Sequence, residues 1–430
     1  MLVLGGMARA AVAADMDGDA IATMEQLDAV GGDAGLQFLP DQGVGRRVIE
    51  PMHLNVIVDV DGVDGRYPPA SRCHRVAASN RHIRGAVHMS IVTIGLDLAK
   101  HVFQVHGVDE SGRVVMRKQL RRAAVEEFFA AQPPCLVGME ACATAHHWAR
   151  RVAALGHQVR LIPPTRVKAY VQRGKKNDAT DAAAIAEAVT RPHMAFVPVK
   201  SEDQQAVLML HRTRDLLVRQ RTMLINALRA HLAEFGIIAA QGRQKVGELM
   251  AGMAVAAVPD LARSALQELA GQIENCDQRI LALEKEIFSW HKTNEQSSNL
   301  ATIPGIGPIT ASLLAATVTD PSAFKNGRQM AAWLGLVPRQ NSSGGKDRLG
   351  KITKTGDRSI RRLLVIGATS VIRYARTKAP GDAEWLKALL GRKPTRVVTV
   401  ALANKMARIA WAVLTRGEVY RKTPPMPATA

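Results

Sequence analysis

The pattern of apolar and polar residues predicts a sheet-forming region that begins near residue 90. Five short runs predict strands, at 91–98, 101–109, 113–120, 135–141 and 158–162. The first is rich in β-branched residues, and the second alternates in the manner of a half-buried strand. Helical patterns follow the third, fourth and fifth of these runs, at 123–132, 146–156 and 178–191. The order strand-strand-strand-helix-strand-helix-strand-helix predicts an α/β unit with a mixed sheet and helices on its faces.

The pattern changes to helix after residue 200. Helical periodicity over 203–235 places Leu210, Leu217, Leu224 and Leu228 on one side. Over 259–291 the apolar residues alternate in steps of three and four, which is a heptad seam made of Leu266, Leu269, Ile273, Cys276, Ile280, Leu283, Ile287 and Trp290. Gly236 and the glycine-rich stretch 242–252 separate the two helices. We expect a helical hairpin or coiled coil that serves as spacer and assembly surface, although the first helix fits an ordinary bundle equally well.

Composition divides the chain further. Residues 1–88 contain eight arginines, eleven acidic residues and no lysine, whereas the whole chain has a net charge of +19. We therefore interpret 1–88 as an atypical, poorly ordered extension. The predicted domains are an α/β catalytic domain (89–200), a helical connector (201–298), a basic helical C-terminal domain (299–420) and a short tail (421–430).

The excess of positive charge favours a polyanionic partner, and nucleic acid is the first candidate. A protein that is merely soluble and basic is the alternative. The four cysteines show no zinc-ligand spacing and fit a reducing compartment. The chain has no run of 18 apolar residues, so we expect a cytoplasmic protein without a membrane span.

Four carboxylates stand at the ends of predicted elements. Asp97 ends the first strand, Glu140 ends the fourth, and Asp178 and Asp181 lie three residues apart in the first turn of the helix at 178–191. The order of the predicted strands and helices is that of the RNase H-like fold, in whose sheet the first and fourth strands are neighbours, so the four groups would converge at one sheet end. Such a set tolerates its own repulsion only around cations, and oxygen ligands suit Mg²⁺. Asp178 and Asp181 could instead simply cap their helix.

The C-terminal part contains a second motif, "IPGIGPITASLLA" (303–315). A turn with Gly305 and Gly307 between two helices resembles a helix-hairpin-helix. Such a turn offers backbone N–H groups to a phosphate without reading sequence. The alternative is a plain turn between helices.

A third motif is a basic loop within 335–362, where Ser342 and Ser343 precede two glycines. Cations around the serines could neutralise a phosphate while a hydroxyl attacks it, although a serine in such a loop is more often a turn residue. The candidate nucleic-acid-binding cations are Arg339, Lys346, Arg348, Lys351, Lys354, Arg358, Arg361 and Arg362.

Taken together, six motifs resemble the DEDD transposases of bacterial insertion sequences, the IS110 family with its large second subgroup. They are "GLDLAK", "GMEACATAHHWA", "KNDATDAAAIAEA", "IPGIGPITA", "AAWLGLVPRQNSSGGK" and "GKITKTGDRSIRRLL". The resemblance covers about 90–416 and implies a RuvC-like domain, a coiled-coil connector and a C-terminal transposase domain. It also implies that Asp97, Glu140, Asp178 and Asp181 form the DEDD tetrad and hold Mg²⁺.

The same resemblance implies a covalent mechanism. Members use a serine of the C-terminal domain as nucleophile, which falls on Ser343 with Ser342 as the alternative. They are guided by a bridge RNA that pairs with target and donor DNA, and they assemble as dimers or tetramers. We therefore expect a transposase or site-specific recombinase that cuts and rejoins DNA through a phosphoserine intermediate. The competing hypotheses are a hydrolytic RuvC-like junction nuclease and a non-catalytic architectural DNA-binding protein.

Overall fold

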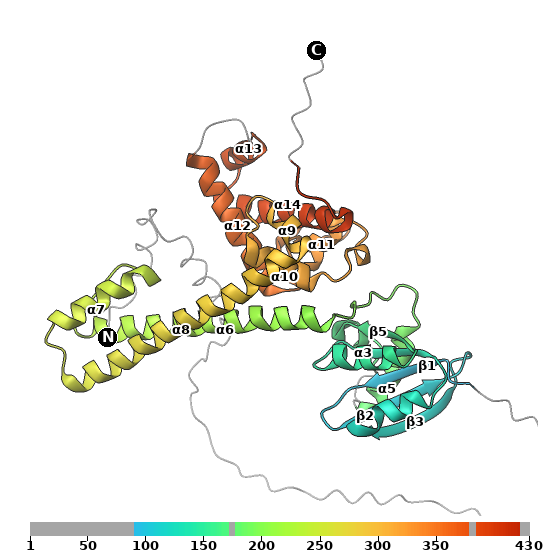
Figure 1. The fold of residues 1–430 in the computed structure, drawn as a ribbon. Helices are drawn as coiled ribbons and strands as arrows, with labels where there is room; N and C mark the ends of the chain where they lie inside the picture. Colours follow the sequence, from blue (N-terminus) through green and yellow to red (C-terminus); the bar gives the residue numbers. More distant parts are fainter. Residues whose placement is uncertain (1–89, 172–176, 378–383, 422–430) are drawn as a thin grey trace, which may run out of the picture. The chain divides into compact units, whose positions relative to one another are not determined.

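The computed structural model describes residues 90–171, 177–377 and 384–421. The predicted extension at 1–88 lies outside the described residues, as does the predicted tail apart from Arg421. The described chain consists of a mixed sheet with its helices, a long helical hairpin and a C-terminal group of helices (Figure 1).

Five strands form the main sheet in the order β3-β2-β1-β4-β5. Their bounds are Thr93–Asp97 (β1), Val102–Val108 (β2), Val114–Arg121 (β3), Leu136–Glu140 (β4) and Gln158–Ile162 (β5). β1, β2 and β3 pair antiparallel in turn, whereas β4 runs parallel to both β1 and β5. Parallel neighbours require a crossover, and the crossover from β4 to β5 runs through α3 (Ala145–Ala154). The predicted mixed sheet is confirmed, with all five strands where the sequence pattern put them.

Helices cover both faces of this sheet. α2 (Val125–Ala130) and α3 pack on the face to which Ile94 and Leu96 point, in a core where the rings of Phe103 and Trp148 meet edge to face at 5.1 Å. α5 (Asp178–Val189) contacts β1, β2 and β4. Because successive residues of a strand point to opposite faces, Gly95 faces α5. A short helix, α4 (Pro164–Val167), and the 3₁₀ turn Arg122–Ala124 complete this part.

The connector is a hairpin of two long helices, α6 (Glu202–Ala233) and α8 (Asp260–Thr293), which lie side by side (Figure 1). Ser201 and Gln204 form a reciprocal capping box that starts α6. The glycine-rich segment predicted as a separator instead holds the 3₁₀ turn Arg243–Lys245 and the helix α7 (Val246–Val255). Leu249 and Met253 of α7 are buried against the hairpin, so burial outweighs the low helix propensity of the glycines.

The heptad seam of α8 is buried within the chain itself. Five of its residues are buried and the other three are partly buried; the buried ones are Leu266, Ile273, Cys276, Ile280 and Ile287. Because α6 covers it, the seam predicted for assembly serves the packing of the hairpin. A coiled-coil assembly between subunits stays a prediction.

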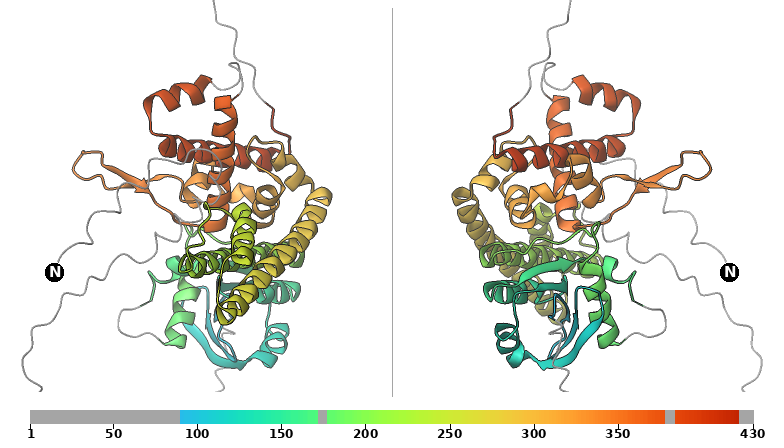
Figure 2. Two further views of the ribbon diagram at one scale, coloured as in Figure 1. Left: turned by 90° about the vertical axis from the view of Figure 1, so that its left-hand side faces the viewer. Right: turned by 90° about the vertical axis from the view of Figure 1, so that its right-hand side faces the viewer.

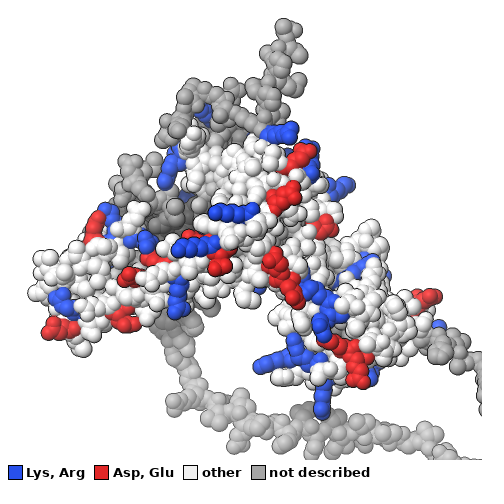
Figure 3. Space-filling view, in the orientation of Figure 1, with Lys and Arg blue, Asp and Glu red and all other residues white. Residues whose placement is uncertain are grey.

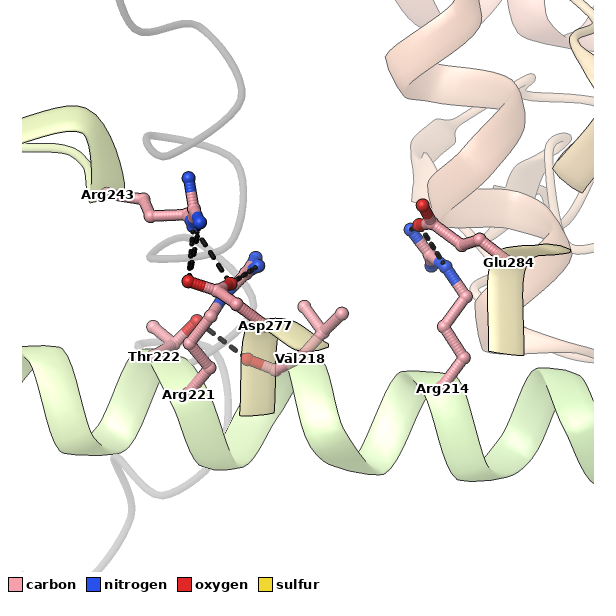
Figure 4. Close-up of polar contacts among 7 residues, drawn as sticks. All are labelled: Arg214, Val218, Arg221, Thr222, Arg243, Asp277 and Glu284. Atoms are coloured by element: carbon pink, nitrogen blue, oxygen red, sulfur yellow. Dashed lines mark hydrogen bonds and ion pairs between the residues drawn. The ribbon is translucent and has the colours of Figure 1, made fainter. Parts of the chain in front are cut away.

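The facing seam of α6 is partly polar. Its residues follow heptad spacing, and they are Val207, His211, Arg214, Val218, Arg221, Ile225, Leu228 and Leu232. The buried face is therefore turned by one residue from the predicted leucine stripe, of which only Leu228 is fully buried. Arg214 pairs with Glu284 at 2.7 Å, and Asp277 pairs with both Arg221 at 2.7 Å and Arg243 at 2.5 Å (Figure 4).

The C-terminal part is a group of helices around α14 (Thr395–Arg416). The others are α9 (Glu295–Ala301), α10 (Pro308–Thr317), α11 (Gly327–Trp333), α12 (Arg358–Thr377) and α13 (Glu384–Arg392), with the 3₁₀ turn Pro321–Ala323. Within the described residues, α14 alone is long and apolar enough to cross a membrane. Half of that apolar stretch is buried, in contact with α11 and α12, which is the pattern of a core helix. The predicted helical C-terminal part is confirmed.

One element of this part is not helical. β6 (Pro338–Gln340) and β7 (Leu349–Ile352) form an antiparallel hairpin where the sequence predicted a mobile loop. The hairpin projects from the neighbouring helices (Figure 2). The loop prediction was wrong because every residue from Pro338 to Lys351 is exposed, so the segment has no buried face to produce an alternating pattern.

Candidate active site

Asp97 and Glu140 lie next to each other at one end of the sheet. Each is the last residue of its strand, and the two strands are parallel neighbours. The pairing register sets Gly95 opposite Gly138, two residues before each acid. Because strand side chains repeat every second residue, Asp97 shares a face with Gly95, and Glu140 shares a face with Gly138. Both carboxylates therefore belong to the face that α5 covers.

The two glycines let α5 come close to the sheet. A Cβ atom on Gly95 would lie 2.1 Å from the Ala182 carbonyl oxygen and 2.5 Å from the Ala186 nitrogen. A Cβ atom on Gly138 would lie 2.8 Å from the Cβ atom of Val189. The strand glycines thus fix the distance of α5 from the sheet, and with it the distance of the first turn of α5 from Asp97.

The first turn of α5 carries the other two acids. Asn177 caps this helix, since its Oδ1 atom accepts a hydrogen bond from the Thr180 N–H at 2.8 Å. Asp178 and Asp181 both lie in the first turn. The residue that caps the helix is therefore Asn177 and neither of the two aspartates. The negative charge of the aspartates is favourable at this position, beside a helix N-terminus.

The electrostatics of Asp97 link all four groups. Burial, and then the charges of Asp181, Asp178 and Glu140, raise the pKa of Asp97 to about 6. Burial together with Glu140 and Asp97 also raises the pKa of the Cys142 thiol. Asp97, at the sheet end, therefore experiences the negative charge of all three other predicted acids.

The donor set fits a divalent cation by its chemistry. Four carboxylates supply hard oxygen ligands. The pKa of Asp97 is raised first by burial and then by the charges of the other three acids, and a bound cation would relieve that repulsion. In the part of the chain that the structure describes, no three His, Cys, Asp or Glu side chains are already gathered closely enough to hold a metal. The other three acids thus influence Asp97 through their charge, but the carboxylate oxygens are not yet close enough together to coordinate one ion.

The tip of the β6–β7 hairpin holds the two candidate serines. Gly344 and Gly345 have φ angles of 55° and 74°, which is a type I′ turn between Ser343 and Lys346. The Ser342 hydroxyl donates to Gln340 Oε1 at 2.9 Å and accepts from the Arg348 N–H at 2.9 Å.

Ser343 differs from its neighbour in its hydrogen bonding. Its hydroxyl has no hydrogen-bond partner among the described residues, and its side chain is exposed at the tip. The Ser342 hydroxyl is therefore held by hydrogen bonds within the hairpin, whereas the Ser343 hydroxyl is exposed.

The glycine turn at 302–307 joins α9 and α10, as predicted. Gly305 has a φ of 85°, and a Cβ atom there would lie 2.8 Å from the Gly367 carbonyl oxygen of α12. Gly305 is thus required by close packing against α12. Phosphate binding by this turn, with Gly307 at the cap of α10, stays a prediction.

The predicted cations divide into two groups. Those on and just after the hairpin are exposed, and they are Arg339, Lys346, Arg348, Lys351, Lys354 and Arg358. Arg361 instead donates to the carbonyl oxygens of Leu334 and Thr355, and Arg362 pairs with Asp215 of α6. In Figure 3, basic side chains stand out at several separate places on the face drawn, with acidic side chains between them.

Comparison with known proteins places the chain in a family. Residues 94–237 match the transposase family model with the DEDD motif of IS110, and residues 297–381 match the model of the IS116/IS110/IS902 transposase family. A Pseudomonas aeruginosa protein named "Probable family 20 transposase" is 50% identical over 337 residues, which is 77% of this chain and 99% of that protein. The chain belongs to the IS110 family of transposases.

Two further relatives agree with this assignment. The transposase for insertion sequence element IS1328 of Yersinia enterocolitica is 42% identical, over 77% of this chain and 99% of its own length. The transposase for IS1111A of Coxiella burnetii is 40% identical, over 81% of this chain and 96% of its own. This IS110-family chain is therefore a transposase of an insertion sequence, an enzyme that cleaves and rejoins DNA.

Sequence reasoning missed three residues that position the tetrad. They are Gly95, Gly138 and Asn177, which set the approach and the start of α5. The signal was present, because "GLD" and "GME" each place a glycine two residues before the acid. A glycine inside a buried strand indicates close approach of another backbone.

Proposed function

We propose that this transposase cuts and rejoins DNA through a covalent phosphoserine intermediate on Ser343, assisted by Mg²⁺ at Asp97, Glu140, Asp178 and Asp181. The observation that carries the proposal is the placement of the four acids, because Asp97 and Glu140 end parallel neighbouring strands on the face that α5 covers and the other two acids lie in the first turn of α5. Burial, and then the charges of the other three acids, raise the pKa of Asp97 to about 6, in agreement with this placement. A carboxylate in such a position suits cation binding better than structural stabilisation.

The exposed hydroxyl at the hairpin tip supports the choice of nucleophile. In the proposed step the Ser343 oxygen bonds to a DNA phosphorus, the bond from that phosphorus to one strand breaks, and the released strand end carries away a proton as a hydroxyl. Attack by a strand hydroxyl on the phosphoserine reverses the step and frees the serine. The phosphoester bond is conserved throughout, so no nucleotide cofactor is required.

Cations and acids of the protein would stabilise the charges that develop during this reaction. The exposed cations of the hairpin, such as Arg339 and Lys346, would neutralise the phosphate under attack. Mg²⁺, when bound by the four acids, would stabilise charge on the attacking and leaving oxygens. The proposed guide is a structured RNA and the proposed assembly is a dimer or tetramer, as the family resemblance implies.

The test is to incubate the protein with labelled DNA carrying the ends of the insertion sequence and with RNA transcribed from the element. The reaction is stopped by denaturation and separated by size. A labelled protein–DNA adduct that requires Mg²⁺ supports the proposal. Nicked DNA free of protein would favour a hydrolytic nuclease, and uncut DNA would favour an architectural role.

A further inference from the structure

The C-terminal part contains a hollow whose lining includes none of the four predicted acids and no residue of the β6–β7 hairpin. It is bounded by α11, α13 and α14 and has a volume of about 640 Å³. Its lining includes two tryptophans, two asparagines and three cations, and contains no acidic residue among the residues that the structure describes. Pockets that hold a small ligand have volumes of about 300–1,000 Å³, so the hollow is large enough for a nucleotide.

Trp385 of α13 forms an aromatic wall. Its side chain is 45% exposed, and the Nζ atom of Lys405 lies 4.3 Å from its ring centroid. Trp411 of α14 also lines the hollow, and its side chain is held in place because its Nε1–H donates to the Pro321 carbonyl oxygen at 3.1 Å. The lysine lies over one face of the exposed ring in a cation–π contact. A flat aromatic ring can stack on that tryptophan when the flexible lysine side chain turns to a phosphate.

The charged part of the lining lies beside this ring. Arg328, Lys405 and Arg408 are exposed. Asn404 donates to the Leu336 carbonyl oxygen at 3.1 Å, so its amide is held in place while its Oδ1 atom accepts no hydrogen bond from the described residues. The hollow therefore combines an exposed aromatic ring, a fixed hydrogen-bond acceptor and three exposed cations.

We infer that this hollow binds an unpaired nucleotide of a nucleic-acid strand, with the base stacked on Trp385 and the phosphate held by Lys405, Arg408 and Arg328. A base within a duplex is stacked and paired on both sides, so it cannot enter a pocket of this kind without being extruded. Single strands expose their base faces, and stacking on an aromatic side chain contributes to their binding whatever the base. The inference concerns binding alone and does not depend on the serine mechanism.

The test measures fluorescence anisotropy of labelled 12-nucleotide probes with the full chain: single-stranded DNA, single-stranded RNA and a DNA duplex of the same sequence. Trp385→Leu should weaken binding of the single strands about 10-fold or more, because stacking is lost, and leave duplex binding within about twofold. Trp385→Phe should restore most of the loss. The matched control is Trp333→Leu, since Trp333 is similarly exposed at 38% but lies outside the hollow, and it should change neither.

The cations give an independent measurement. Lys405→Gln should lower the slope of log Kd against log salt for single strands by about 0.7, whereas Trp385→Leu should leave that slope unchanged. An oligonucleotide with abasic sites should quench the tryptophan fluorescence of the wild-type chain less than the intact one, which tests stacking without any variant.

The relative affinities for the RNA and DNA strands identify which nucleic acid the hollow binds. Tighter binding of the RNA strand assigns the hollow to a guide RNA, and tighter binding of the DNA strand assigns it to an unpaired stretch of the DNA substrate. Equal loss of duplex and single-strand binding in Trp385→Leu, or equal quenching by abasic and intact strands, would overturn the inference. Failure to form the serine adduct would leave these binding results unaffected, so the two proposals fail separately.

Discussion

The substitution Gly95→Ala probes how the fold holds the acids together. The added methyl group would lie 2.1 Å from the Ala182 carbonyl oxygen, 2.5 Å from the Ala186 nitrogen and 2.9 Å from the Ala186 Cβ atom. Carbon atoms in favourable contact are about 3.5–4.0 Å apart, so the overlap exceeds 1 Å at the closest atom. The atoms at 2.1 and 2.5 Å are helix backbone, so α5 must move away from the sheet as a unit.

The expected cost follows from this displacement. Overpacking a filled core costs about 1–3 kcal/mol, and a rigid backbone neighbour places Gly95→Ala at the upper end of that range. Movement of α5 by about 1 Å also moves Asp178 and Asp181 away from Asp97, and a misplacement of that size costs on the order of 100-fold in rate. We therefore expect a loss of about 3 kcal/mol in the free energy of unfolding and about 100-fold slower DNA cleavage.

The assay combines denaturant unfolding with single-turnover cleavage, the latter under conditions where the variant is still folded. Gly271→Ala is the matched control, because a Cβ atom there meets nothing within 4 Å and the residue lies inside α8. It should stabilise the chain by about 0.5–1 kcal/mol and leave cleavage unchanged. Wild-type stability and wild-type cleavage in Gly95→Ala would refute the close packing of α5 and its role in placing the acids.

Three further predictions concern the metal site, the hairpin and the N-terminal segment. Because the pKa of Asp97 is raised in the folded chain, its charge destabilises the metal-free protein increasingly as pH rises from about 4 to about 6, and fully above that. A pKa raised by about two corresponds to about 3 kcal/mol, which solvent screening reduces to about 1 kcal/mol for a partly exposed group. Asp97→Asn should therefore raise metal-free stability at pH 8 by about 1 kcal/mol while abolishing cleavage. A clear drop in calorimetric stability with activity intact would contradict the metal site. Asp277→Ala leaves the partly buried Arg221 of α6 and the exposed Arg243 without their shared partner, so chemical denaturation should show a loss of about 1–3 kcal/mol, and an unchanged midpoint would show that the pairs are dispensable. A chain that begins at Met89 should express in soluble form and transpose like the full chain, and loss of either property on truncation would show that residues 1–88 are needed.

The sheet was predictable because the run that contains β1 is rich in β-branched residues, β2 alternates, and turn or helix signals separate the short strands. The order of the strands and helices then placed the first and fourth strands side by side, and with them Asp97 and Glu140. What the pattern could not give is the distance between α5 and the sheet, which depends on backbone contacts at Gly95 and Gly138.

Two elements escaped prediction for different physical reasons. The β6–β7 hairpin has no buried face, so its strands carry no alternation, and the glycines at its tip are typical of any turn. The seam of α6 carries His211 at a buried position and Arg214 and Arg221 at partly buried ones, so a search for apolar side chains selected the adjacent leucines. Those polar residues are tolerated because partners on other helices satisfy them, such as Ser312 for His211 and Glu284 for Arg214.

The central claim is that the Ser343 oxygen bonds to DNA. The most direct measurement is the covalent adduct formed by Ser343→Ala and by its matched control Ser342→Ala, with the attachment site in the wild type mapped by mass spectrometry of the protease-digested adduct. The account predicts a nucleotide on Ser343, no adduct with Ser343→Ala despite retained folding and DNA binding, and at least partial activity with Ser342→Ala. An adduct that persists in both single variants and in the double variant would contradict the serine mechanism.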